Sequence, residues 1–391
     1  MFNKIKPLVS EIKDDLLRWR RHFHKHPELG YQERNTVEYI KEELLSLPNI
    51  SVKQLTPTSL FASIKGAKAG KKIALRADID ALPIKEENDE PFCSVNEGIM
   101  HACGHDAHTA MLMGAAKLIS KLSDTLKGEV SFIFQHAEEL QPGGAKELVK
   151  AGVLNKAQMI FGLHVNPHRP FGSINYNEGI YCASADNFNI EIRGKGAHGA
   201  YPHFSIDPIV IGSQIVNALQ TIVSRRIDPF LAPVVTIATF KAEGAYNIIP
   251  ETALLKGTWR SHDEKVREEV PKLIAKTAEN IGAIYGAECK FNRVVGGFPV
   301  GINGEKALDV VKKVYEEYLS KDYDLYKEPK PMFGAEDFSY YQQKIPGAFL
   351  FLGLGGGADL HTPHFKLNED VMPIGVSIYL SLLHHLLGFE I

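Results

Sequence analysis

The sequence lacks a strong excess of either charge. Its 391 residues include 44 lysines and arginines against 47 aspartates and glutamates, for a formal net charge of -3. No polybasic stretch is present, so we expect neither nucleic acid nor an anionic membrane as a partner. Residues 1–26 mix both charge signs and lack the apolar core of a signal peptide, and we find no later stretch with the roughly 18 apolar residues of a membrane span. We therefore expect a cytoplasmic location.

The sequence is also poor in cysteine. Its four cysteines, Cys93, Cys103, Cys182 and Cys289, lie far apart and form no disulfide framework. In a reducing compartment they would remain thiols, available for packing or for metal binding. Only Cys103 has neighbours that suggest more than packing.

Length and pattern predict two domains. A chain of 391 residues exceeds the size at which one hydrophobic core stops growing. After helical spacing in residues 1–45, strands and helices alternate, which is typical of an α/β domain with a mostly parallel central sheet flanked by helices. This larger domain is predicted over residues 1–183 and 297–391. Residues 184–296 have a split βαββαβ order, which predicts an inserted, smaller α+β domain of ferredoxin-like type, each with its own core.

Polar side chains follow several of the predicted strands. In an open α/β sheet, ligands bind beyond the carboxyl ends of the strands. The residues at these ends are Asp78 and Asp80 after KIALRA, Glu138 and Glu139 after VSFIFQ, His164 at the end of MIFGL, and His361 and His364 after AFLFLG. A single carboxylate at a strand end is usually a solvated turn, but these segments together indicate one site.

The stretch MHACGHDAH, from Met100 to His108, adds three histidines, a cysteine and an aspartate directly before an apolar helix. Cys103 and His105 are two residues apart, so both can face one ion from a tight loop, with sulfur and imidazole as donors. A buried cysteine beside a core histidine is the alternative. Asp106 is expected to cap the helix, whose N-terminus adds partial positive charge.

The adjacent carboxylates Glu138 and Glu139 repel each other unless something positive separates their roles. If one binds metal, the other can remain a base beside an activated water; two solvated glutamates are the alternative. One thiolate, one carboxylate and three neutral imidazoles carry two negative charges, which suits a pair of divalent cations with a bridging hydroxide. This donor set predicts two-metal-assisted hydrolysis of an amide. Soft sulfur favours zinc, cobalt or nickel, although site geometry and cellular supply can favour manganese.

Nine segments in order resemble the metal-dependent N-acyl-amino-acid amidohydrolases, the group of aminoacylase, hippurate hydrolase and auxin-conjugate hydrolase. They are RADIDALPI, GIMHACGHDAHTAMLMGAA, FIFQHAEE, GLHV, GKGAHGAYPH, NIIP, GTWR, FGAEDFSYY and LHTPHF, and they span nearly the whole chain. The resemblance implies cleavage of the amide bond of an N-acyl-L-amino acid, with release of a carboxylate and a free amino acid. It also implies a catalytic domain with an inserted lid that makes the dimer interface.

The resemblance implies roles for individual residues. It matches the metal ligands to Cys103, His105, Glu139, His164 and His361. Glu138 matches the general base and proton shuttle, and Asp78 matches the carboxylate that orients a ligand or the water. Two divalent ions per subunit follow, manganese by resemblance, with zinc, cobalt or nickel as alternatives. His364 is then expected either to support a ligand or to be structural, and His101 and His108 are candidates for lining the site without binding metal.

Four further residues of the family pattern fall outside the metal ligands. His198 in GKGAHGAYPH matches a histidine that reaches into the partner subunit's site and stabilises the oxyanion. Asn247 matches a residue that holds the transition state, and Arg260 one that binds the substrate carboxylate, which a planar guanidinium grips in bidentate fashion. Without the resemblance, Arg260 would be expected to be a surface strand residue. Glu336, beside Asp337, matches a substrate-side loop, with a plain turn as the alternative. We therefore expect a homo-oligomer, a dimer at least and optionally a tetramer.

One position departs from the family pattern, since His136 stands where proline is usual. The acyl preference is therefore not carried over. The rival activities are those of a dipeptidase and of a deacetylase for an N-acetylated diamino acid, which would use the same site with a different pocket. A non-catalytic, metal-binding oligomeric protein is a further alternative, against which the intact Glu138 argues.

Overall fold

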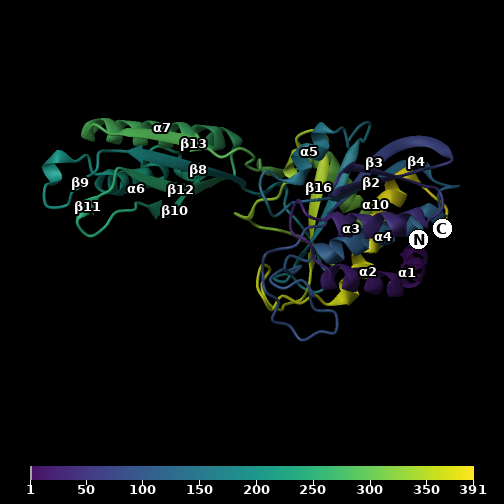
Figure 1. Ribbon diagram of the computed structural model, residues 1–391. Helices are drawn as coiled ribbons and strands as arrows, with labels where there is room; N and C mark the ends of the chain where they lie inside the picture. Colours follow the sequence, from purple (N-terminus) through teal and green to yellow (C-terminus); the bar gives the residue numbers. More distant parts are fainter. Residues whose placement is uncertain (1) are drawn as a thin grey trace. The chain divides into compact units, whose positions relative to one another are not determined.

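The computed structural model describes residues 2–391 (Figure 1). The chain divides into two compact units, in each of which the core is continuous. Unit 1 runs up to Tyr181 and resumes over Ile302–Lys330 and Asp337–Ile391, and unit 2 holds Cys182–Gly301 and Pro331–Glu336. The predicted insert, 184–296, lies inside the first part of unit 2.

Our boundaries differ from unit 2 by a few residues at each end of the insert, since 182–183 and 297–301 also belong to it, and our assignment of all of 297–391 to the catalytic domain misses Pro331–Glu336, which belongs to unit 2. Hydrogen bonds explain the difference. The amide of Ala183 donates to the carbonyl oxygens of Met332 and Gly334 at 3.0 and 3.1 Å. Nη1 of Arg260 donates to the carbonyl oxygen of Phe333 at 2.9 Å. Sequence pattern carries no trace of such long-range backbone pairing.

Unit 1 is built on an eight-stranded sheet. In sheet order the strands are β1 (Ile50–Thr56), β2 (Ser59–Lys65), β4 (Lys127–Gln135), β3 (Lys68–Asp78), β5 (Met159–Asn166), β16 (Gly347–Gly353), β6 (Ile174–Tyr176) and β15 (Leu325–Lys327). The four central strands β4, β3, β5 and β16 are mutually parallel. Towards the edges, β1 with β2, β2 with β4, and β16 with β6 are antiparallel.

Helices cover both faces of this sheet, as the alternation along its strands requires. Unit 1 contains α1 (Phe2–Ser10), α2 (Lys13–Lys25), α3 (Arg34–Leu45), α4 (His105–Lys121), α5 (Gly144–Lys150), α8 (Glu305–Val314), α9 (Ser339–Gln342) and α10 (Met372–Leu387), with short helical turns at Tyr315–Leu319 and Glu369–Val371. The buried residues Ile73, Leu75 and Ala77 of β3 share a core with α4 and α10. Residues that point to the other face of the sheet, such as Phe349 of β16, contact Phe338 at the start of α9 instead.

Unit 2 is a four-stranded antiparallel sheet with two helices. Its elements are β8 (Ser184–Arg193), β9 (Ala197–His198), α6 (Pro208–Arg225), β10 (Val234–Lys241), β11 (Ile248–Ile249), β12 (Thr252–Ser261), α7 (Glu264–Tyr285) and β13 (Glu288–Arg293), with 3-10 turns at Pro202–Phe204 and Pro229–Leu231. The sheet order is β10-β12-β8-β13, which is the ferredoxin-like arrangement of a βαββαβ unit. Two further short strands, β7 (Gly179–Cys182) and β14 (Gly301–Asn303), pair where the chain leaves and rejoins unit 1. The predicted fold class, an α/β domain plus a smaller α+β domain, is confirmed.

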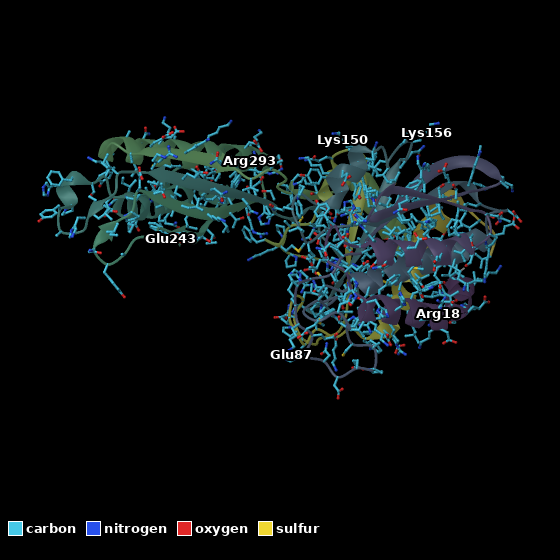
Figure 2. The ribbon with its side chains drawn as sticks, in the orientation of Figure 1. Arg18, Glu87, Lys150, Lys156, Glu243 and Arg293 are labelled. Carbon is cyan, nitrogen blue, oxygen red and sulfur yellow. The ribbon has the colours of Figure 1, made fainter. Side chains whose placement is uncertain are left out.

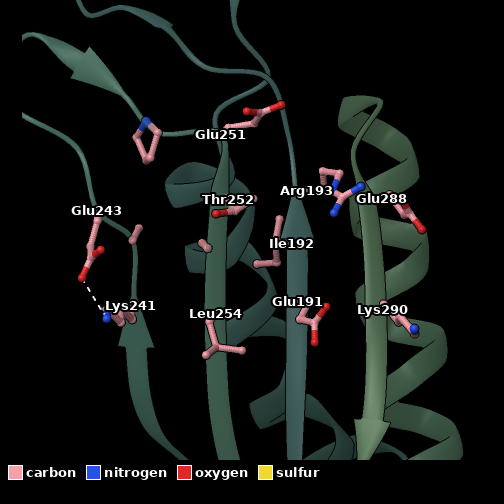
Figure 3. Close-up of a pocket in the computed structure, with 13 residues that line it drawn as sticks. Glu191, Ile192, Arg193, Lys241, Glu243, Glu251, Thr252, Leu254, Glu288 and Lys290 are labelled. Carbon is pink, nitrogen blue, oxygen red and sulfur yellow. Dashed lines mark ion pairs between the residues drawn. The ribbon is translucent and has the colours of Figure 1, made fainter.

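One face of the unit 2 sheet packs on its helices and the other is open. Phe188, Ile190 and Ile192 of β8 are buried with residues of α6 and α7. The alternate residues Glu191 and Arg193 line a shallow concavity on the open face, together with residues of β10, β12 and β13 (Figure 3). Both charge signs occur there, and Lys241 pairs with Glu243 at 2.8 Å. None of the predicted site residues lines this concavity.

Charged side chains inside unit 2 are paired. Asp186 of β8 is fully buried and receives bonds from Arg267 at 2.7 Å and from Arg293 at 2.8 Å. Arg293, labelled in Figure 2, also pairs with Glu268 on α7. These contacts link β8, β13 and α7 and leave no isolated charge at Asp186, as burial of a carboxylate requires.

One helical stretch, Glu369–Leu387, is long and apolar enough to cross a membrane, contrary to our sequence expectation. Its location explains its composition. In the structure 72% of the apolar window is buried, and α10 packs against α4 and α8 in the core of unit 1. A helix that is buried on most sides is apolar all round for that reason.

Candidate metal centre

The carboxyl ends of the central strands bring the predicted site residues of unit 1 together. β3 ends at Asp78, which is level with Gln135 at the end of the parallel neighbour β4. His164 lies on β5 opposite Phe351 of β16, and the chain after β16 leads to His361. This is the edge at which an open α/β sheet binds its ligands.

The loop that carries Cys103 ends at the first residue of α4, His105. Gly104 occupies the N-cap position with φ +86°, and a Cβ there would lie 2.5 Å from Cγ2 of Val165. Only glycine satisfies both the left-handed backbone and the close approach. The prediction that Asp106 caps this helix is wrong. Its carboxylate instead binds Nε of Arg20 and Nδ1 of His24 on α2, at 2.9 and 2.8 Å.

Backbone carbonyls fix the orientation of two imidazoles. Nδ1 of His105 donates to the carbonyl oxygen of Asp80 at 2.9 Å, and Nδ1 of His164 donates to the carbonyl oxygen of Val165 at 2.7 Å. In each ring Nδ1 is occupied by a carbonyl oxygen, which leaves Nε2 to face the cluster. Nε2 of His105 is buried without a hydrogen-bond partner among the described residues, which is the state expected of a metal ligand held by a second partner.

The ligand atoms converge on the sulfur of Cys103. Sγ lies 3.4 Å from Nε2 of His164 and 3.2 Å from Nε2 of His361. Nε2 of His361 is also 3.0 Å from Oε1 of Glu139, which is 4.0 Å from Nε2 of His105. Cys103 thus belongs to two groups that could each hold an ion, one with His105 and His164 and the other with Glu139 and His361. Glu139 likewise belongs to two groups, the second with His105 and Glu138, so these residues would together hold the ions.

The electrostatics of this cluster call for cations. Burial, followed by the charges of Glu139 and Glu138, raises the pKa of Cys103 well above its usual range. Although burial opposes it, the carboxylates of Asp78 and Asp80 raise the pKa of His105 to about 10. Divalent ions would offset the negative charge and hold the sulfur as thiolate, so the donor set fits two metal ions.

Glu138 lies beside this cluster, with 7% of its surface exposed. One of its carboxylate oxygens belongs to a group within 4.8 Å that also includes His105 and Glu139. The amide of Glu139 donates to Oδ2 of Asp80 at 2.9 Å, and the preceding Ala137 has φ +50°. The turn after β4 that carries the two adjacent glutamates is therefore fixed by its backbone contacts.

Asp78 is held among three cationic or polar partners. Nη1 of Arg76 donates to its Oδ2 at 2.7 Å, and Nδ1 of His108 donates to its Oδ1 at 2.6 Å. Against the effect of burial, His105, Arg76 and His108 hold the pKa of Asp78 well below its usual value. Nε2 of His108 accepts from the amide of Val165, so both ring nitrogens of His108 are used and it orients Asp78.

The remaining histidines of the motifs take different places. His361 adopts φ +61°, a rare conformation for histidine that its amide bond to the carbonyl of Ala102 helps to hold. His364 is exposed and pairs with Glu87 at 3.2 Å. His101 is buried, but it belongs to none of the potential metal-binding groups found among the described residues.

In unit 2 the predicted residues fall into two groups. β9 and β11 place His198 opposite Ile248, and the amide of Gly199 donates to the carbonyl oxygen of Asn247, so His198 and Asn247 are neighbours. Arg260 lies near the far end of β12, eight residues beyond Thr252, where that strand begins next to β11. Eight residues of extended strand span roughly 26 Å. Glu336 ends the segment that joins unit 2, and Asp337 begins the next part of unit 1.

Sequence reasoning missed a buried network behind the site. Arg76 is 1% exposed and binds Asp78 and Asp337, the latter at 2.9 Å through Nη2. Gln135 donates to Asp337 through Nε2, and the amide of Ala145 donates to it as well. Burial raises the pKa of Asp337 to about 6, in opposition to Arg76. The arginine and aspartate in the otherwise apolar strand KIALRAD were the available signal.

Comparison with known proteins matches this geometry to a family. The model of the family described as Peptidase family M20/M25/M40 matches residues 74–385. Thermostable carboxypeptidase 1 of Saccharolobus solfataricus is 40% identical, over 100% of this chain and 98% of that protein. The N-acyl-L-amino acid amidohydrolase of Geobacillus stearothermophilus is 46% identical, over 76% of this chain and 80% of the relative.

A solved structure supports the same assignment. A dinuclear metal-binding peptidase of the M20 family from Bacillus subtilis is 38% identical with a TM-score of 0.81, and the match covers 96% of this chain and 98% of that chain. The resemblance to the metal-dependent amidohydrolases is therefore confirmed. The chain belongs to peptidase family M20/M25/M40 and is a metal-dependent hydrolase of amide bonds.

Proposed function

We propose that the chain hydrolyses N-acyl-L-amino acids at a two-metal centre and releases a carboxylate and a free amino acid. The observation that carries the proposal is the convergence of Cys103, His361 and Glu139 within hydrogen-bonding range, with Glu138 beside them. A metal store would have no use for the second carboxylate. The amidohydrolase relative from Geobacillus stearothermophilus supports the choice of substrate.

The chain's own residues would then divide the chemistry among them. Cys103, His105, His164, Glu139 and His361 would hold the ions, which supply Lewis acidity and lower the pKa of water. A carboxylate oxygen of Glu138 would take a proton from the water as the water oxygen bonds to the amide carbonyl carbon. The C–N bond would break as Glu138 returns that proton to the departing amine nitrogen, and the carboxylic acid formed would pass its own proton to the amine or to solvent. Manganese is our choice of metal, and the cytoplasm, which keeps Cys103 reduced, is our choice of compartment.

Arg260 is proposed to bind the substrate's free carboxylate. One Nη already donates to the carbonyl of Phe333, which fixes the plane of the guanidinium. The guanidinium can then bind a carboxylate through two N–H groups with little further loss of side-chain entropy. Asn247 and Glu336 are proposed as further contacts to the substrate.

His198 is proposed to act in the site of a second subunit. Because β12 separates His198 and Asn247 from Arg260 by roughly 26 Å, one insert cannot place all three on one small substrate. The end that carries His198 also exposes Tyr201, Tyr246 and Ile248. β10 is an edge strand of its sheet, and an exposed edge with apolar neighbours is a common docking surface for a second chain. A homodimer satisfies both observations, and a tetramer is a further option.

A carboxypeptidase-like activity is the strongest second candidate, because the Saccharolobus solfataricus relative is similar over its whole length. A peptide's C-terminal residue and an N-acyl amino acid present the same group, an amide beside a free carboxylate. Dipeptides and N-acetylated diamino acids share it too. The acyl side of the pocket decides among them.

Metal content gives the first prediction. The purified chain should carry two divalent ions, and chelation should abolish turnover and lower the thermal midpoint, since ions that bind only the folded state stabilise it. His361→Ala should lose about one ion, whereas Cys103→Ala should weaken both, because the sulfur belongs to both groups. Elemental analysis after gel filtration measures this. Equal losses in the two variants would contradict a shared sulfur.

A substrate panel tests the proposed activity. N-acetyl and N-benzoyl amino acids should be hydrolysed faster than dipeptides. Replacing the free carboxylate by its carboxamide should lower kcat/KM by roughly 10- to 100-fold, the value of a charge-assisted hydrogen bond. Arg260→Ala should remove that difference while metal content stays at two ions. Faster cleavage of dipeptides than of every acyl substrate would favour the peptidase reading instead.

Glu138→Gln tests the base. The amide keeps the shape of the carboxylate but cannot take up the proton of the water, so turnover should fall by roughly 100- to 10,000-fold. The metal content and the thermal midpoint should match those of the wild type. An activity near that of the wild type would refute the assignment of Glu138 as base.

Complementation between two inactive chains tests the role of His198. His198→Ala should lose on the order of 100-fold in kcat, as expected for one oxyanion donor. If His198 acts across the interface, co-expression with Glu138→Gln should restore activity. In a mixed dimer one site has both residues, so about a quarter of wild-type turnover is expected from random pairing. Persistent inactivity of proven mixed dimers would place His198 in its own subunit's site.

A further inference from the structure

The turn that leads into Glu138 is held in a conformation that alanine rarely adopts. Ala137 has φ +50°, where the Cβ of an L-residue comes too close to the backbone. Such a conformation persists only where the surroundings over-determine it. The contacts of Ala137 therefore decide the direction in which the next residue, Glu138, leaves the strand.

Those contacts come from the segment between α2 and α3. Oε1 of Glu33 accepts a hydrogen bond from the amide of Ala137 at 2.8 Å, across 104 residues of sequence. A Cβ on Gly30 would lie 3.2 Å from Cα of Ala137, and the ring of Tyr31 meets that of His136 at 5.3 Å. The segment between α2 and α3 thus packs against the turn at His136 and Ala137.

Glu33 is an unusual choice for a purely structural contact. Its side chain is 0% exposed, and Oε2 has no hydrogen-bond partner among the described residues. Burial and the nearby charge of Asp80 raise the pKa of Glu33 to about 8. A neutral carboxyl group accepts the amide bond of Ala137 without adding a negative charge behind Glu138.

We propose that Glu33 is a positioning residue of the reaction, which orients the general base by holding the backbone amide of Ala137. The inference rests on the proposed role of Glu138 as base. Glu33 would act through the hydrogen bond that its Oε1 accepts from Ala137, and it is not among the proposed metal ligands or substrate contacts. Asp80 makes the corresponding contact on the other side of Glu138, because its Oδ2 accepts a hydrogen bond from the amide of Glu139.

The test compares three single variants for kcat, KM, metal content and thermal midpoint, on whichever amide the wild type turns over fastest. Glu33→Gln reproduces the neutral acid and should keep kcat within a factor of about three. Glu33→Ala removes the acceptor and should lower kcat roughly 10- to 100-fold, the cost of a misplaced reacting group. KM and the two bound ions should stay as in the wild type.

Glu28→Ala is the matched control. Glu28 lies on the same segment and accepts the amide and hydroxyl of Thr36 at the start of α3, at 2.8 and 2.9 Å. Its loss should lower the thermal midpoint, as loss of a helix-terminal acceptor does, but should leave kcat unchanged.

Three results would overturn the inference. They are full kcat in folded Glu33→Ala, an equal loss of kcat in Glu33→Gln, and a loss of kcat in Glu28→Ala as large as that in Glu33→Ala. Failure of the base assignment itself would be recognised separately, by turnover in Glu138→Gln.

Discussion

Negative charge packed around one buried sulfur is the constraint on which this structure depends. Asp78, Asp80, Glu138 and Glu139 all approach His105 or Cys103, and Arg76 offsets only part of their charge. A buried group of carboxylates is costly unless cations accompany it. The site is therefore best described as a cluster that metal ions would complete, because the ligand atoms already lie within 4.8 Å of one another in each group.

This cluster is rigid because backbone atoms, and not only side chains, hold it. Carbonyl oxygens of Asp80 and Val165 set the tautomers of His105 and His164. Parallel strand ends fix the spacing of these groups, and the left-handed positions at Gly104, Ala137 and His361 aim the loops between them. Of these positions only Ala137 and His361 are strained, since glycine adopts a positive φ at no steric cost, and strain at two places around one site suits a function that needs ligand and base geometry preset.

The sequence predicted most of the fold class and the composition of the site. Short apolar runs that alternate with helical segments predicted the α/β core, and strand-end residues such as Asp78 and His164 lie near one another because parallel strands share one ligand-binding edge. What could not be read was long-range backbone pairing. Pro331–Glu336 joins unit 2 through its carbonyl oxygens, which accept hydrogen bonds from unit 2. Asp106, predicted to cap α4, binds Arg20 instead. Such contacts depend on the assembled fold and leave no local pattern.

The proposal of a dimer rests on the distance between His198 and Arg260 in unit 2. His198 lies on β9, which pairs with β11 just before the start of β12, whereas Arg260 lies near the other end of β12. If both are substrate contacts, as we propose, one monomer cannot bring both of them to the same small substrate. In a symmetric dimer each end can serve a different site, because the twofold operation presents every residue twice. The length of β12 would then set the distance between two sites that share one pair of inserts. Assembly in that arrangement becomes part of the catalytic machinery, since neither chain alone would hold a complete set of substrate contacts.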